Sequence, residues 1–119
     1  MTEYLIYFNQ QWVGDHSAEW FASRAPLAHA VVQDMKDAGV LVFGGGLEED
    51  IDTAVSVDTT SGTPVFTDGP YTEAAEFLGG FVAVDVPDEA AARAWAARVA
   101  EACGWPQTVR RFQPGSLRG

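Results

Sequence analysis

The sequence of 119 residues predicts an α+β fold built on a four-stranded antiparallel sheet, with two helices on one face of that sheet. Three observations predict it. The length fits a single domain. Two segments with helical spacing of apolar residues each lie between β-rich apolar segments. Two short strand-like segments in the middle are joined by the turn Ser61-Gly62 and indicate a hairpin. The order β-α-β, hairpin, β-α-β is a ferredoxin-like arrangement with an inserted hairpin.

The first half of the chain contains two expected strands and an interrupted helix. Residues 4–8 are almost all apolar, as in a central strand covered on both faces. Asp15 is a candidate N-cap, and Pro26 is expected to break the following helix into a short piece, 16–24, and a main piece, 26–38. Gly39 ends that helix, and a strand at 40–43 runs into three glycines. These glycines, residues 44–46, are interpreted as a bulge or a close approach of two backbones.

The second half repeats the pattern after the hairpin, whose strands are expected at 53–58 and 64–67. Asp68-Gly69-Pro70 forms a tight turn. Asp88 then begins an alanine-rich helix that ends at Gly104. The remaining expected segments are a strand at 79–86, the helix at 89–102, a last strand at 107–112 and a mobile tail at 114–119. One domain is therefore predicted over residues 1–113.

Charge and composition exclude several classes of function. The chain has 17 acidic and 7 basic residues, a net charge of -10, and a single lysine, Lys36. Such a surface repels a phosphate backbone and an anionic membrane, so neither nucleic acid nor membrane is an expected partner. One cysteine, Cys103, and two histidines are too few for a structural zinc site or a disulfide. No metal and no cofactor are predicted. The chain shows neither a secretory leader nor an apolar span, which indicates a cytoplasmic protein.

One face of the predicted sheet has no helix to cover it. Residues of the strands at 4–8 and 81–86 make that face apolar. An uncovered apolar face of this kind marks an interaction surface. The sequence therefore predicts a homodimer in which two such faces pack together.

A motif after the hairpin carries a family resemblance. Thr67-Asp68-Gly69-Pro70-Tyr71-Thr72-Glu73 followed by Leu78-Gly79-Gly80-Phe81 resembles the signature of the YCII-related family, in its DGPF subgroup. The similarity extends over nearly the whole chain, with His29 in a helix before Gly39 to Gly45 and an Ala/Trp-rich helix after Asp85-Val86. Tyr71 stands where the subgroup has phenylalanine, and Pro26 departs from the pattern of the first helix.

The resemblance implies a dimeric α+β barrel, a fold shared with small-molecule isomerases, dehalogenating lyases and monooxygenases. It also implies an active-site pair of a histidine and the motif aspartate, which are His29 and Asp68 here. Some relatives occur beside transcription proteins that resemble sigma factors. No general activity is implied for the DGPF subgroup itself.

The chemistry of the pair His29 and Asp68 is acid–base chemistry. An imidazole exchanges a proton near neutral pH, and a carboxylate on its other nitrogen fixes the tautomer. Each residue also has a structural interpretation: His29 as a helix histidine bonded to a carbonyl, and Asp68 as a turn-forming residue. Tyr71, Tyr7 and Trp20 are candidate walls of a ligand pocket, although aromatic residues are more often part of a core.

Three functional hypotheses follow. The first is a cofactor-free enzyme, an isomerase or lyase, that moves a proton on a small molecule with His29 as acid/base and Asp68 as its orienting partner. The second is a non-catalytic module that binds a small molecule or accompanies a transcription protein. The third is a structural domain in which Asp68 serves the turn alone.

Overall fold

The sheet confirms the predicted α+β class. The computed structural model describes residues 1–116, so the end of the predicted tail, 117–119, lies outside the described residues. Four antiparallel strands are arranged in the order β2-β5-β1-β6, which is the ferredoxin-like order. Their bounds are Thr2–Asn9 for β1, Leu41–Gly46 for β2, Leu78–Val86 for β5 and Thr108–Arg111 for β6.

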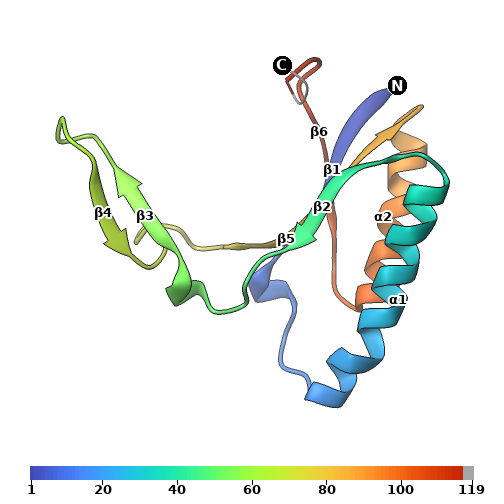
Figure 1. Ribbon diagram of the computed structural model, residues 1–119, viewed down its shortest axis with the longest axis horizontal. Helices are drawn as coiled ribbons and strands as arrows, with labels where there is room; N and C mark the ends of the chain where they lie inside the picture. The colour runs from blue at the N-terminus through green and yellow to red at the C-terminus, as the bar shows by residue number, and fades with distance from the viewer. Residues whose placement is uncertain (117–119) are drawn as a thin grey trace.

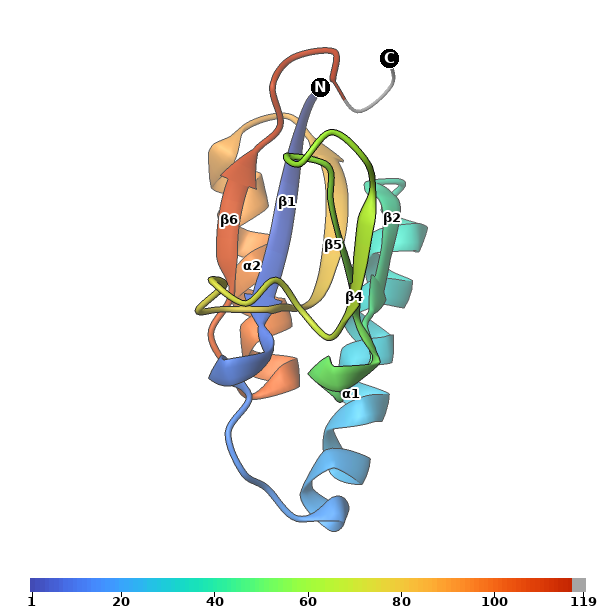
Figure 2. The same cartoon turned by 90° about the vertical axis from the view of Figure 1, so that its left-hand side faces the viewer.

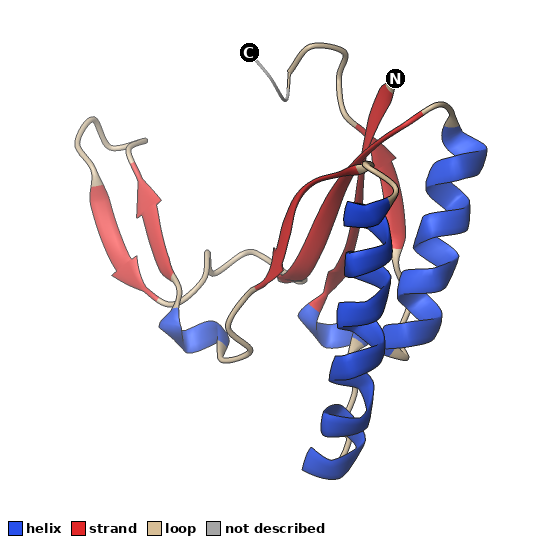
Figure 3. Ribbon diagram, turned by 45° about the vertical axis from the view of Figure 1, so that its right-hand side comes forward, coloured by secondary structure: helices blue, strands red, loops and turns tan. Residues whose placement is uncertain are grey.

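Two helices, α1 (Ala18–Asp37) and α2 (Glu89–Cys103), cover one face of the sheet (Figures 1 and 3). The core lies between them and that face. Its largest fully buried side chains are Ile6, Met35, Val84 and Val86. Alternate residues of β1 and β5 point to this side, as the period of a strand requires. In the described part of the chain, no helix is long and apolar enough to cross a membrane.

The expected break at Pro26 is wrong, because α1 is a single helix with Pro26 inside it. Proline removes one helical hydrogen bond, here the bond to the carbonyl of Ala22. Both residues are exposed, so water can hydrate that carbonyl. Burial of Val31 and Met35 on the sheet holds the remainder of the helix in place. The N-cap is also not Asp15. Ser17 fills that position and accepts a hydrogen bond of 3.1 Å from the Trp20 amide.

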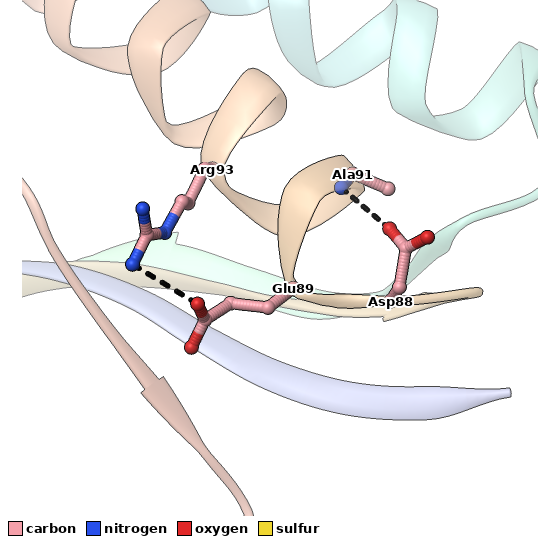
Figure 4. Close-up of polar contacts among 4 residues, drawn as sticks. All are labelled: Asp88, Glu89, Ala91 and Arg93. Carbon is pink, nitrogen blue, oxygen red and sulfur yellow. Dashed lines mark hydrogen bonds and ion pairs between the residues drawn. The ribbon is translucent and has the colours of Figure 1, made fainter.

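The start of α2 confirms the predicted cap. The Ala91 amide donates a hydrogen bond of 2.9 Å to Oδ1 of Asp88, and Arg93 pairs with Glu89 one turn apart at 3.0 Å (Figure 4). The helix ends at Gly104, whose φ of +91° suits a residue without a side chain. The sequence therefore determines both ends of α2 locally.

The glycines of β2 lie where β2 and β5 approach closely. A Cβ at Gly44 would be 2.7 Å from the carbonyl oxygen of Phe81, which no real side chain tolerates. The pairing also shifts register between Leu41 and Phe43. The predicted close approach is therefore confirmed at the glycines, whereas the irregularity in strand pairing lies just before them. The glycines belong to the strand itself, however, and not to a segment that follows it.

The hairpin of β3 (Val55–Asp58) and β4 (Val65–Asp68) forms a separate two-stranded sheet. It projects away from the body of the molecule on the side of the sheet opposite the helices (Figures 1 and 2). Val57 and Phe66 are cross-strand partners, so their side chains share one face of the hairpin. Both are exposed, at 58% and 69%. The hairpin thus presents an apolar face to its surroundings.

The face of the main sheet that carries no helix is also apolar at its centre. We call it the outer face and define it by Leu5, Tyr7, Phe43, Phe81 and Ala83. The rings of Phe43 and Phe81 lie 5.7 Å apart, and Tyr7 stacks on Trp12. Phe43 is 65% exposed. In the protomer, the outer face and the hairpin lie on the same side of the molecule (Figure 2).

Two glycines with positive φ allow the cost of backbone strain to be separated from the cost of a clash. A Cβ at Gly39 would meet nothing within 4 Å, whereas a Cβ at Gly104 would lie 2.8 Å from the Trp20 ring. We expect Gly39→Ala to lower the free energy of unfolding by about 1–2 kcal/mol through strain alone. Gly104→Ala should cost about 2–4 kcal/mol, because overpacking adds to the strain. Urea titration monitored by circular dichroism measures both, and equal losses would contradict the role assigned to Trp20.

Candidate functional site

A cavity of about 540 Å³ lies between the two helices and the sheet, beside the edge strand β2. This volume is in the range of small-molecule sites. The floor of the cavity is apolar and comes from four elements, with Ile6, Leu41, Val82 and Val99 among its residues. A ligand in it would be surrounded mainly by aliphatic side chains, so binding would remove apolar surface from water.

The polar side of the cavity comes from α1. His29, Gln33 and Lys36 follow one another at helical spacing, so they lie along one flank of the helix. The apolar stripe with Ala28 and Val32 runs beside them into the cavity. His29 is exposed and makes no hydrogen bond to another residue of the described chain. Its ring is therefore available to a ligand, and the alternative of a histidine bonded to a carbonyl is not found in the protomer.

The β2 end of the cavity is open because of its glycines. Gly46 pairs with Gly80, and a Cβ at Gly80 would meet the ring of Phe8 at 2.9 Å on the helix side of the sheet. Cross-strand partners share a face, so a side chain at Gly46 would point to the same side. At Gly46, however, a Cβ meets nothing within 4 Å, and φ is not positive. The fold does not need glycine at this position, and its absence of a side chain leaves the cavity open.

Two further polar groups line the cavity away from α1. The Cys103 thiol at the end of α2 is partly buried, and burial raises its pKa. Gln107 lies just before β6, and its Nε2 is buried without a hydrogen-bond partner in the structure. A buried donor without an acceptor is costly. Within the described residues, no group of three His, Cys, Asp or Glu side chains is placed to hold a metal ion.

His29 and Asp68 occupy different parts of the protomer. His29 lines the cavity, whereas Asp68 is the exposed last residue of β4 and lines neither this cavity nor the second hollow. The backbone just after Asp68 continues the pairing at the base of the hairpin, because the Gly69 amide donates a hydrogen bond of 2.6 Å to the Ala54 carbonyl. The sheet lies between the hairpin and α1 (Figure 1). A contact between the imidazole and the carboxylate therefore stays a prediction.

The three predicted wall residues lie elsewhere in the protomer. Tyr7 is on the outer face against Trp12, and Tyr71 is exposed in the segment after the hairpin. Trp20 stacks on His16, with ring centroids 3.6 Å apart, and also packs against Gly104. None of the three is among the residues that line the cavity. A contact of these side chains with a ligand likewise stays a prediction.

Sequence reasoning missed four of the polar lining residues, namely Gln33, Lys36, Cys103 and Gln107. Their spacing along the chain gives no motif, because they come from three separate segments. The one available signal was the spacing of His29, Gln33 and Lys36 along one flank of α1.

Fold and cavity together define a ferredoxin-like α+β domain with an open, mainly apolar cavity between its helices and its sheet. Its family follows from sequence comparison. The model of the YCII-related domain matches residues 15–103, and the chain belongs to this family. A comparison with curated proteins gives no match.

The burial of Cys103 predicts slow alkylation of its thiol. The raised pKa leaves less thiolate at a given pH than in the unfolded chain, and the thiolate is the reactive form. We expect the rate of reaction with iodoacetamide to rise with pH around a midpoint above that of the same protein in concentrated urea. Because Cys103 is the single cysteine, mass spectrometry follows the reaction without interference. A midpoint at or below the value in urea would contradict this assignment.

Proposed function

We propose that this chain, as a DGPF-type member of its family, binds a small molecule in the cavity beside β2 and transfers a proton on it without a cofactor. The observation that carries the proposal is a cavity of about 540 Å³ whose lining is mostly apolar and includes His29, which makes no hydrogen bond within the described chain. An apolar site strengthens electrostatic interactions and excludes water from a reactive intermediate.

The proposed step is general acid–base catalysis by His29. A neutral imidazole removes a proton from a carbon next to a carbonyl group of the substrate, and the electron pair of the broken C–H bond forms an enolate. In a substrate whose enolate is conjugated with a C=C bond, the imidazolium then returns the proton to the far carbon of that conjugated system, which moves the double bond and isomerises the substrate. Alternatively, the enolate expels a leaving group with its bonding pair, which completes an elimination.

A second candidate function, binding without turnover, is favoured by the position of Asp68. No carboxylate of the described residues hydrogen-bonds the His29 ring within one chain, so nothing there fixes its tautomer. Such a module would hold a metabolite in the same cavity, or it would accompany a transcription protein. The two functions share a ligand site and differ in whether His29 has a chemical role.

Gly46→Leu tests the ligand site that both functions share. We expect Gly46→Leu to abolish binding of small aromatic fragments, because the new side chain enters the cavity. The free energy of unfolding of the Gly46→Leu variant should stay within about 1 kcal/mol of that of the parent protein, since a Cβ at this position meets nothing within 4 Å. Chemical shifts of the Val32 and Val99 methyl groups report the binding. If the Gly46→Leu variant still bound the fragments, the cavity would not be the ligand site.

His29→Ala tests catalysis separately. A screen of small aromatic fragments would first identify a substrate. With that substrate, we expect the turnover of the His29→Ala variant to be lower by about 10²–10⁴-fold, while fragment binding persists. If His29→Ala left turnover unchanged, His29 would have no catalytic role, and only the binding function of the cavity would remain. His16→Ala is the matched control, because His16 stacks on Trp20 outside the cavity.

We further propose that the protein is a homodimer formed through the outer face. Support comes from the exposed Phe43 next to Phe81 and from the apolar face of the projecting hairpin, which lies on the same side. One isologous pairing would cover these surfaces on both copies at once.

The dimer is tested by light scattering after size-exclusion chromatography. We expect a mass twice the 12.8 kDa of one chain, and a monomer for Phe43→Asp, because a charge would be buried in the interface. Leu27→Asp is the control. Leu27 is exposed at 49% on α1, away from the outer face, and its substitution should leave the dimer intact. A monomeric parent protein would contradict the proposal.

A further inference from the structure

The cavity differs from the rest of the molecule in its charge. Acidic residues number 17 among the 119 of the chain, yet none is among those that line the cavity. The single lysine of the chain, Lys36, does line it. The second hollow of the protomer shows the contrast, because Glu48, Asp50 and Glu76 all line that one. A chain this acidic thus keeps carboxylates out of one particular concave surface.

Lys36 is not neutralised by the protein. The ion pairs in the described chain are Arg93 with Glu89 and Arg98 with Asp34, and Lys36 is in neither. Its position in the last turn of α1 suits the negative end of the helix dipole. That effect explains a cation at this end of the helix. It does not explain why the cavity beside it lacks acidic groups.

Gln107 gives a second, independent indication. Its Nε2 is a buried hydrogen-bond donor without an acceptor at the edge of the same cavity. Buried polar groups in folded proteins are nearly always paired, and an exception calls for a missing partner. The missing partner of a donor is an acceptor atom. The side-chain amide of Gln33, by contrast, already donates to Asp37 at 3.0 Å.

We propose that the ligand of the cavity is an anion with an apolar body, such as an aromatic or branched carboxylate, for which Lys36 supplies the opposite charge at one end of the cavity and Gln107 a hydrogen-bond donor at the other. This inference rests on the proposed function only in that the cavity is the ligand site. The anionic group would lie toward Lys36 and the reacting carbon toward His29. Those residues are seven apart, which separates them by roughly 10 Å along the helix axis.

Three probes with one ring and different charges test the ligand class. Benzoate, benzamide and benzylamine carry charges of about −1, 0 and +1 at neutral pH. Their dissociation constants come from the Val32 and Val99 methyl shifts and, independently, from protection of Cys103 against iodoacetamide. We expect benzoate to bind about tenfold more tightly than benzamide, and benzylamine to bind most weakly.

Substitutions assign the preference to the named residues. Lys36→Met should weaken benzoate binding about three- to tenfold and leave benzamide within about twofold, because only the charged probe loses its counter-charge. Lys36→Arg should restore most of the benzoate affinity. Arg93→Gln is the matched control, because it removes the same charge from a residue outside the cavity and should change neither probe.

Each outcome decides something. Benzamide or benzylamine binding as tightly as benzoate, or benzoate binding that is insensitive to Lys36→Met, would overturn the anion preference while the cavity stays a ligand site. Absence of methyl shifts and of Cys103 protection with all three probes would overturn both this inference and the proposed function.

Discussion

The structure depends on one constraint, which is that both helices pack on a single face of the sheet. Side chains at alternate positions of β1 and β5 fill the core on that side. On α2 the buried residues are alanines, which bring the helix close to the strands. On α1 they are Val31 and Met35, and Met35 is fully buried. The cavity lies at the other edge of this core, where β2 supplies glycines in place of apolar side chains.

The three glycines of β2 meet two different needs. Gly44 is required by the fold, because β5 passes too close for any Cβ. Gly46 is not required, since neither its φ nor its neighbours forbid a side chain. A strand residue that packs against a core is normally apolar and large. Glycine at this position lowers the packing that β2 gives to the sheet, and in return it leaves room above the strand. The cavity is thus a property of the sequence at this point and not only a gap between elements.

Features that depend on neighbouring residues were predictable from the sequence. Asp88 and Gly104 limit α2, and Ser61-Gly62 joins the hairpin strands, as expected from local chemistry alone. Pro26 was misjudged because its cost depends on tertiary context: exposure at Ala22 allows hydration, and packing of Met35 holds the helix. His29 was identified through the family resemblance. Lys36 and Gln107 are 71 positions apart in the numbering, and only the folded chain places both at one cavity.

The overall charge of -10 places a limit on how an anion could be selected. At physiological ionic strength, exposed charges are screened beyond about 8 Å, so most of the carboxylates on the surface act weakly at the cavity. Screening also weakens any long-range attraction of an anion to Lys36. When the salt concentration is low, the net negative charge of the protein repels an approaching anion. Selection must therefore happen inside the cavity, where Lys36 acts on the anionic group at contact distance, the Gln107 amide binds the other end of the ligand, and no carboxylate lines the surface. Burial of the ligand's apolar body, worth about 25 cal/mol per Å², then supplies most of the affinity, and the local charge decides which apolar molecules are retained.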